Sequence, residues 1–204
     1  MKNYTTLKNG VYENEIVIEK SRFIAFACSV SNVGQANLFI ESVSKKHYDA
    51  THNCYAYVTA DGQKFSDDGE PQGTAGMPIL NAIKGRNLSN VAVVVTRYFG
   101  GIKLGAGGLV RAYGNSAGEV LDMAQKSEVK FCKVFCIRCA YSVACVCESV
   151  IQTFGKTVEK EYYDQVKLKA VVPEEFAEKF KEEITDKTNG KIEMEEISND
   201  YIEF

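Results

Sequence analysis

The sequence lacks several features that define large classes of proteins. No apolar run approaches the length of about 18 residues that a membrane-spanning helix needs. The N-terminus shows no charged segment followed by an apolar one, as an export signal would. The seven cysteines are an odd number, which suits a reducing compartment better than a disulfide framework. We therefore expect a cytoplasmic protein that makes no membrane contact.

Motifs for several familiar chemistries are also missing. No Gly-Lys-Ser/Thr closes a phosphate-binding loop, and no serine occupies a Gly-x-Ser-x-Gly elbow. The only histidines, His47 and His52, flank a predicted helix-to-strand turn and do not share one helical face. Cys136 and Cys139 form a Cys-x-x-Cys motif, but their odd separation on a strand directs them to opposite faces. The sequence predicts neither a bound metal nor a cofactor.

The charge is small and unevenly distributed. The net charge of −3 argues against indiscriminate attraction to polyanions. Residues 1–125 hold 12 basic and 11 acidic side chains, a balance of +1, whereas residues 126–204 hold 12 and 16, a balance of −4. A surface that binds nucleic acid is therefore expected to be a local patch on the first part of the chain.

Hydrophobic periodicity predicts mixed helices and strands in this first part. We expect a strand over 22–30, a helix capped by Ser31 or Asn32, and a second strand over 53–60. Residues 61–76 are expected to form an irregular loop, and residues 1–10 a loosely held lead-in. The later predicted elements are a short helix over 77–84, a valine-rich strand from Val91 and a long helix from Leu109.

The second part has the order βαββαβ, which is the ferredoxin-like plan. The polar segment 125–130 is the best candidate for a linker, and we place two domains at 1–127 and 128–204. The fold class is accordingly α+β. The expected elements are strands at 132–139, 156–163, 166–172 and 191–197 and helices at 142–154 and 174–187.

The valine-rich strand leads into a glycine-rich loop that is suited to bind an anion. Glycines allow positive φ and close approach of a partner, and the helix that follows starts with unpaired N–H groups and partial positive charge. The alternative is that the glycines only permit a tight turn. Tyr98, like Phe99, is also of a type that stacks on unpaired bases. The candidate binding residues are Arg97, Tyr98, Gly100, Gly101, Lys103, Gly105, Gly107, Gly108 and Arg111.

The acidic part of the 61–76 loop offers candidates for catalysis. Asp67, Asp68 and Glu70 lie within four positions and are suited to hold a divalent cation or to act as general acid and base. A solvated acidic turn is the alternative. His52 is suited to bind an anion or carry a proton, or else is structural. We expect strand alternation to separate His52 from Cys54, which argues against a Cys/His nucleophile.

Three strings in the first part resemble the YigZ/IMPACT family. They are HYDATHNCYAY at 47–57, SDDGEPQGTAGMPIL at 66–80 and VVVTRYFGGIKLGAGGLVRAY at 93–113. The resemblance covers residues 16 to about 125 and implies an α/β sandwich like the second domain of a small-subunit ribosomal protein. It also implies that the ferredoxin-like second domain is similar to the last domain of elongation factor G.

The resemblance implies a role near translation. Eukaryotic relatives interfere with a kinase that responds to uncharged tRNA, but this chain lacks their N-terminal recruitment domain, so that role is not transferred. Bacterial members are suspected of binding RNA or ribosomes. The first hypothesis is a translation-associated regulator that binds RNA, a ribosome or a small anionic ligand through residues 66–76 and 97–108. The alternative is an enzyme acting on a phosphorylated or carboxylated small molecule through the acidic loop and Arg97, Lys103 and Arg111.

Overall fold

The computed structural model describes residues 3–204, which divide into two compact units. One unit comprises residues 4–128, and the other comprises residues 129–204 with Asn3. No helix in the described part of the chain is long and apolar enough to span a membrane. The elements are β1 Tyr4–Leu7, β2 Val11–Ile18, β3 Ser21–Ser29, α1 Val33–Lys46, β4 His52–Thr59, β5 Gly62–Ser66, α2 Gly76–Gly85, β6 Val91–Tyr98, α3 Gly105–Met123, β7 Lys126–Cys139, α4 Tyr141–Phe154, β8 Lys156–Tyr162, β9 Val166–Pro173, η1 Glu174–Phe176, α5 Ala177–Lys187 and β10 Ile192–Glu203.

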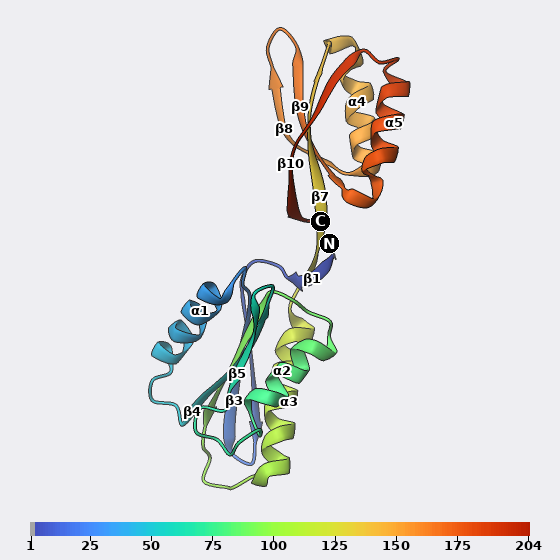
Figure 1. Cartoon of the computed structure of the whole chain (residues 1–204). Helices are drawn as coiled ribbons and strands as arrows, with labels where there is room; N and C mark the ends of the chain where they lie inside the picture. The colour runs from blue at the N-terminus through green and yellow to red at the C-terminus, as the bar shows by residue number, and fades with distance from the viewer. Residues whose placement is uncertain (1–2) are drawn as a thin grey trace. The chain divides into compact units, whose positions relative to one another are not determined.

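The first unit is a three-layer α/β sandwich. Its antiparallel sheet has the strand order β2-β3-β6-β4-β5. Helix α1 packs on one face of this sheet, and α2 and α3 cover the other (Figure 1). This arrangement agrees with the α/β sandwich that the family resemblance implied.

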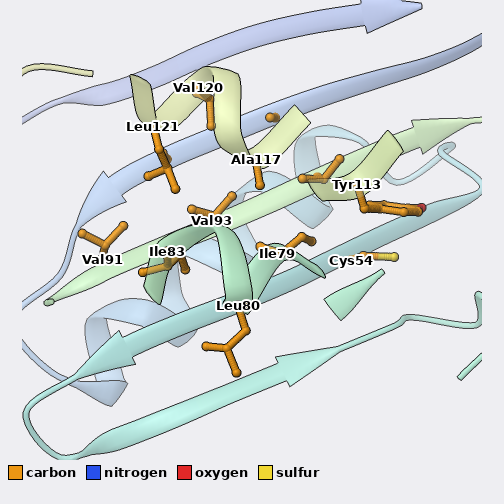
Figure 2. Packing of buried hydrophobic residues seen from close by; sticks show 14 of the residues in the cluster. Cys54, Ile79, Leu80, Ile83, Val91, Val93, Tyr113, Ala117, Val120 and Leu121 are labelled. Carbon is orange, nitrogen blue, oxygen red and sulfur yellow. The ribbon is translucent and has the colours of Figure 1, made fainter. Parts of the chain in front are cut away.

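Strand β6 is the centre of this sandwich. Alternation directs Val91, Val93 and Val95 toward α2 and α3, and Ala92 and Val94 toward α1. Complete burial of a valine contributes about 1.5–3 kcal/mol, several times the contribution of an exposed ion pair. Figure 2 shows Val91 and Val93 packed among side chains of α2 and α3, with Cys54 and Tyr113 at one end of the cluster. The strand that leads to the glycine loop is therefore held rigidly.

The second unit has the predicted ferredoxin-like order. Strands β7, β8, β9 and β10 pair antiparallel in the order β10-β7-β9-β8, and α4 and α5 pack over this sheet. The core contains Phe135, Leu168 and Phe180, all fully buried. The α+β fold class is confirmed.

Several predictions about local structure were wrong. Residues 62–66 form β5, which pairs with β4, so the irregular part of the acidic loop is shorter than expected. Residues 4–7 form β1 with Leu7 buried, while residues 1 and 2 of the expected lead-in lie outside the described residues. The expected linker at 125–130 instead begins β7. In each case tertiary pairing overrode a polar local composition.

Candidate functional site

Three side chains form a row across the sheet at the end of β6. Arg97 lies opposite Phe23 of β3 and opposite His52 of β4 in the antiparallel register. By alternation Arg97 shares the face of Val91, Val93 and Val95, which is the face that α2 and α3 cover. The register therefore brings the predicted candidates Arg97 and His52 together beside the start of α3.

Glu70 is the buried centre of this site. Its Oε1 accepts a hydrogen bond from Arg97 Nη1 at 2.6 Å and another from the Tyr113 hydroxyl at 2.8 Å. His52 Nε2 lies 3.9 Å from Glu70 Oε2. Burial raises the pKa of the Tyr113 hydroxyl, which therefore remains a hydrogen-bond donor. Glu70 and Arg97 are thus a neutralised pair inside the protein.

Arg97 makes further contacts through its Nη2 atom and its guanidinium plane, and its Nε atom has no acceptor among the described residues. The side chain is 6% exposed, and Nη2 donates to Ser21 Oγ at 3.4 Å. The guanidinium carbon lies 5.4 Å from the ring centroids of both Phe23 and Phe99. Within residues 3–204, no group accepts a hydrogen bond from Arg97 Nε. A buried guanidinium N–H without a protein acceptor calls for another partner, such as a water molecule or a ligand.

In the acidic loop, the side chain of Asp67 stabilises the conformation of the loop itself. The Asp67 carboxylate accepts hydrogen bonds from the amides of Gly73, Ala75 and Gly76, at 2.8, 3.0 and 2.8 Å. Burial raises the pKa of Asp67, but the three amide donors outweigh it and hold this pKa below its ordinary value. Asp67 therefore stabilises the start of α2, where a negative charge is favoured.

Asp68 orients the head of β4. Its carboxylate accepts a hydrogen bond from the Asn53 amide at 2.6 Å, and its carbonyl oxygen lies 2.6 Å from His52 Nδ1. Because a carbonyl only accepts, Nδ1 carries the hydrogen, and Nε2 is left to exchange a proton or to bind a ligand. In the described residues, no group of three or more His, Cys, Asp or Glu side chains is arranged to hold a metal ion.

A cavity of about 450 Å³ opens beside these residues. It contains His52, Glu70, Arg97, Lys103 and Gly105 of the predicted set. Among residues 3–204, no side chain caps the N-terminus of α3, whose first-turn amides have no partner within the helix. The remaining lining residues are Thr51, Pro71, Phe99, Leu104, Ala106 and Leu109. The cavity thus combines a lysine, a helix start and a buried arginine.

The other predicted binding residues are placed differently. The Tyr98 hydroxyl donates to Asp49 Oδ1 and accepts from His47 Nδ1, both at 3.0 Å, on the α1 face of the sheet. A Cβ at Gly100 would meet the Lys20 backbone at 2.0 Å, so this glycine permits close packing of two backbones. Tyr98 and Gly100 do not line the cavity. Gly101 has a φ of +85°, a backbone conformation that glycine adopts most readily.

Helix α3 begins earlier than the sequence indicated. It starts at Gly105, so Gly105, Gly107 and Gly108 belong to its first turn and not to a loop. Arg111 and Gly108 line a second hollow of about 590 Å³, which shares Lys103 and Leu104 with the first. Of the predicted binding residues, Arg97, Lys103 and Gly105 line the first cavity, Lys103, Gly108 and Arg111 line the second hollow, and Tyr98, Gly100, Gly101 and Gly107 line neither.

Cys54 does not behave as a nucleophile. Positions 52 and 54 lie on the same face of β4, so the expected separation of His52 from Cys54 was wrong. The Cys54 thiol is fully buried, donates to the Asp67 carbonyl oxygen at 2.9 Å, and has its pKa raised far above the ordinary value by burial. A thiol in this state is inert.

Sequence reasoning missed two members of the site. Tyr113 lies in the predicted helix from Leu109, and only the fold brings its hydroxyl to Glu70. Thr51 lies just before β4, lines the cavity and accepts a hydrogen bond from the Phe99 amide at 3.1 Å. Both residues stand in strings that resemble the family, Thr51 in 47–57 and Tyr113 in 93–113, but nothing in these strings shows which distant side chain each one contacts.

Comparison with known proteins agrees with the architecture. The family model described as the Impact N-terminal domain matches residues 19–121, and the model of a domain of unknown function, DUF1949, matches residues 137–191. IMPACT family member YvyE of Bacillus subtilis is 42% identical over 98% of this chain and 94% of its own length.

Two further similarities cover most of the chain. IMPACT family member YigZ of Escherichia coli is 36% identical over 87% of this chain and 90% of its own length. The crystal structure of a protein described as hypothetical aligns with a TM-score of 0.63 and 31% identity, covering 97% of this chain and 98% of its own. Both domain models and full-length relatives therefore show that this chain belongs to the IMPACT family.

Proposed function

We propose that this protein is a cytosolic, translation-associated regulator that binds RNA, free or within a ribosome, through residues 66–76 and 97–108. Membership of the IMPACT family, to which curated proteins such as YvyE and YigZ also belong, supports a role near translation. The observation that carries the proposal is the buried Arg97, which lines a cavity at the uncapped start of α3 and has an unused N–H.

The chemistry of this cavity favours an RNA phosphate. A helix N-terminus supplies oriented amides and partial positive charge, and Lys103 adds a full positive charge. Phe99 stands beside Arg97 with 46% of its surface exposed, and an exposed ring of this kind stacks on unpaired bases. Phosphate contact and base stacking together are the usual means of holding single-stranded RNA.

Binding of a short single-stranded RNA at increasing salt tests this proposal. We expect the logarithm of affinity to fall linearly with the logarithm of salt concentration, because phosphate contacts release counterions. The exposed Lys103, substituted by Ala, should weaken binding and reduce the salt slope by about 0.7. Lys84→Ala, at an exposed lysine of α2 outside both hollows, is the matched control and should leave both values unchanged. Absence of RNA retention even at low salt would contradict the proposal.

A second function is favoured by the concave shape of the site. A volume of about 450 Å³ lies in the range of small-molecule pockets, and His52 Nε2 and the Glu70 carboxylate, 3.9 Å apart, are side chains of the types that act as general acid or base. In this alternative the protein is an enzyme acting on a phosphorylated or carboxylated small molecule, Lys103 neutralises the charge of the substrate, and Arg97 donates a hydrogen bond to it.

Turnover measurements separate the two functions. A panel of phosphorylated and carboxylated metabolites is incubated with the protein and with His52→Asn, which keeps a donor for the Asp68 carbonyl. Turnover that the variant abolishes supports the enzyme, provided that the variant melts at the temperature of the wild type. RNA binding without turnover of any compound supports the regulator.

A further inference from the structure

We propose that the cavity receives a terminal phosphomonoester, and that its ligand is the phosphorylated end of a single-stranded RNA. This inference rests on the proposed function and names the part of the RNA that the site recognises. Four features of the cavity support it: the burial of the Arg97 side chain, the net positive charge of the lining groups, the available ring nitrogen of His52 and the position of the second hollow.

The depth of Arg97 decides which kind of phosphate reaches it. The side chain is 6% exposed, and its guanidinium carbon lies 5.4 Å from the ring centroids of both Phe23 and Phe99, so only a group that enters the cavity makes contact. An internal phosphodiester carries a nucleoside on each side, and both would have to enter a space of about 450 Å³. A terminal phosphate projects from its chain and enters alone.

The charge of the site matches a dianion better than a monoanion. Glu70 neutralises Arg97 within the buried pair, with Oε1 and Nη1 2.6 Å apart. The uncompensated positive charge then comes from Lys103 and from the start of α3. A phosphomonoester carries between one and two negative charges near neutral pH, whereas an internal phosphodiester carries one.

His52 supplies a contact that only a monoester can complete. Its Nδ1 is committed to the Asp68 carbonyl, so the ring nitrogen that remains available to a ligand is Nε2, which lies 3.9 Å from Glu70 Oε2. Neutral Nε2 accepts the proton of a singly ionised monoester, and protonated Nε2 donates to the doubly ionised form. A diester has no proton to share, so it lacks the first of these contacts.

The second hollow offers a binding surface for the nucleotides that follow the terminal phosphate. Lys103 and Leu104 line both hollows, and Arg111 lines the second, which measures about 590 Å³. A nucleotide whose terminal phosphate lies at Arg97 therefore has Lys103 on its path toward Arg111, where the next phosphate finds a cation. A free mononucleotide would leave Arg111 unused.

Fluorescence anisotropy tests the inference on the full chain. The probes are internally labelled RNA 10-mers of one sequence that differ only at the ends: 5′-phosphate, 3′-phosphate, or hydroxyl at both. We expect one phosphorylated form to bind about tenfold more tightly than the hydroxyl form, as for charge-assisted hydrogen bonds. His52→Asn should abolish this preference, and Lys84→Ala should preserve it.

Competition by a nucleoside monophosphate distinguishes a site for a free mononucleotide from a site for the phosphorylated end of an RNA. Weaker competition by the mononucleotide than by the phosphorylated RNA, with Arg111→Ala reducing only the affinity for RNA, supports the inference. Equal binding of the phosphorylated and hydroxyl RNAs overturns it and leaves RNA binding intact. Binding of the mononucleotide without any binding of RNA overturns both this inference and the proposed function.

Discussion

Glu70 and Arg97 form a buried ion pair, with carboxylate oxygen and guanidinium nitrogen 2.6 Å apart and side chains 4% and 6% exposed. Their positions lie 27 residues apart in the sequence, one after β5 and one at the end of β6. The pair fixes the acidic loop against the sheet, and it sets the charge of the cavity that the proposed functions use.

Removal of one partner of this pair should destabilise the first unit strongly. We expect Glu70→Ala to cost about 3–5 kcal/mol, because Arg97 is left as an uncompensated buried charge. The exposed pair of Glu15 and Arg22, 2.8 Å apart, is the matched control, and Glu15→Ala should cost about 0–1 kcal/mol. Urea unfolding followed by circular dichroism measures both, and equal costs would contradict the structural role of Glu70.

Asp67→Asn should make stability less dependent on pH. The folded-state pKa of Asp67 lies below its ordinary value, so its stabilisation is fully present above the unfolded pKa and is lost as pH falls through the folded pKa. We expect a cost of about 1.5–3 kcal/mol at pH 7, because the amide bonds are to a charged acceptor. The difference from wild type should shrink below about pH 4. A constant difference between pH 7 and pH 3 would contradict this origin.

Two glycines near the start of α3 should respond in opposite directions to alanine. Gly100→Ala places a Cβ 2.0 Å from the Lys20 backbone, and we expect destabilisation of about 1–3 kcal/mol. Gly107→Ala places its Cβ no closer than 3.7 Å to a neighbour and lies in a helix, so we expect stabilisation of about 0.5–1 kcal/mol. Thermal melts of the two variants make the comparison, and a similar loss in both would show that the glycines share one role.

Cys145 should be the thiol that alkylating reagents modify in the folded protein. It is the exposed one among the seven cysteines, whereas burial raises the pKa of Cys28 and of Cys147 to about 12. Thiolates are the reactive species, so the buried thiols should remain unmodified. A short iodoacetamide treatment at pH 8, followed by peptide mass spectrometry, measures this selectivity. Labelling of Cys54 as fast as Cys145 would contradict the buried, protonated state of Cys54.

Periodicity alone predicted much of the secondary structure. The βαββαβ order of the second unit and the Asn32 cap of α1 are confirmed, because each depends on residues close in sequence. Strands β1, β2 and β5 were missed because short or partly exposed strands form only when a neighbouring strand supplies their hydrogen bonds.

The sequence by itself determined which residue types stand at the site: a valine strand ending in Arg97, a glycine-rich helix start and an acidic loop. Only the tertiary structure decided how they are used. Strand register set His52 beside Arg97, α3 brought Tyr113 to Glu70, and the amides at the start of α2 donate hydrogen bonds to the Asp67 carboxylate. The reason is physical: backbone propensity acts over a few residues, whereas a side chain's partner depends on which distant elements pack against it.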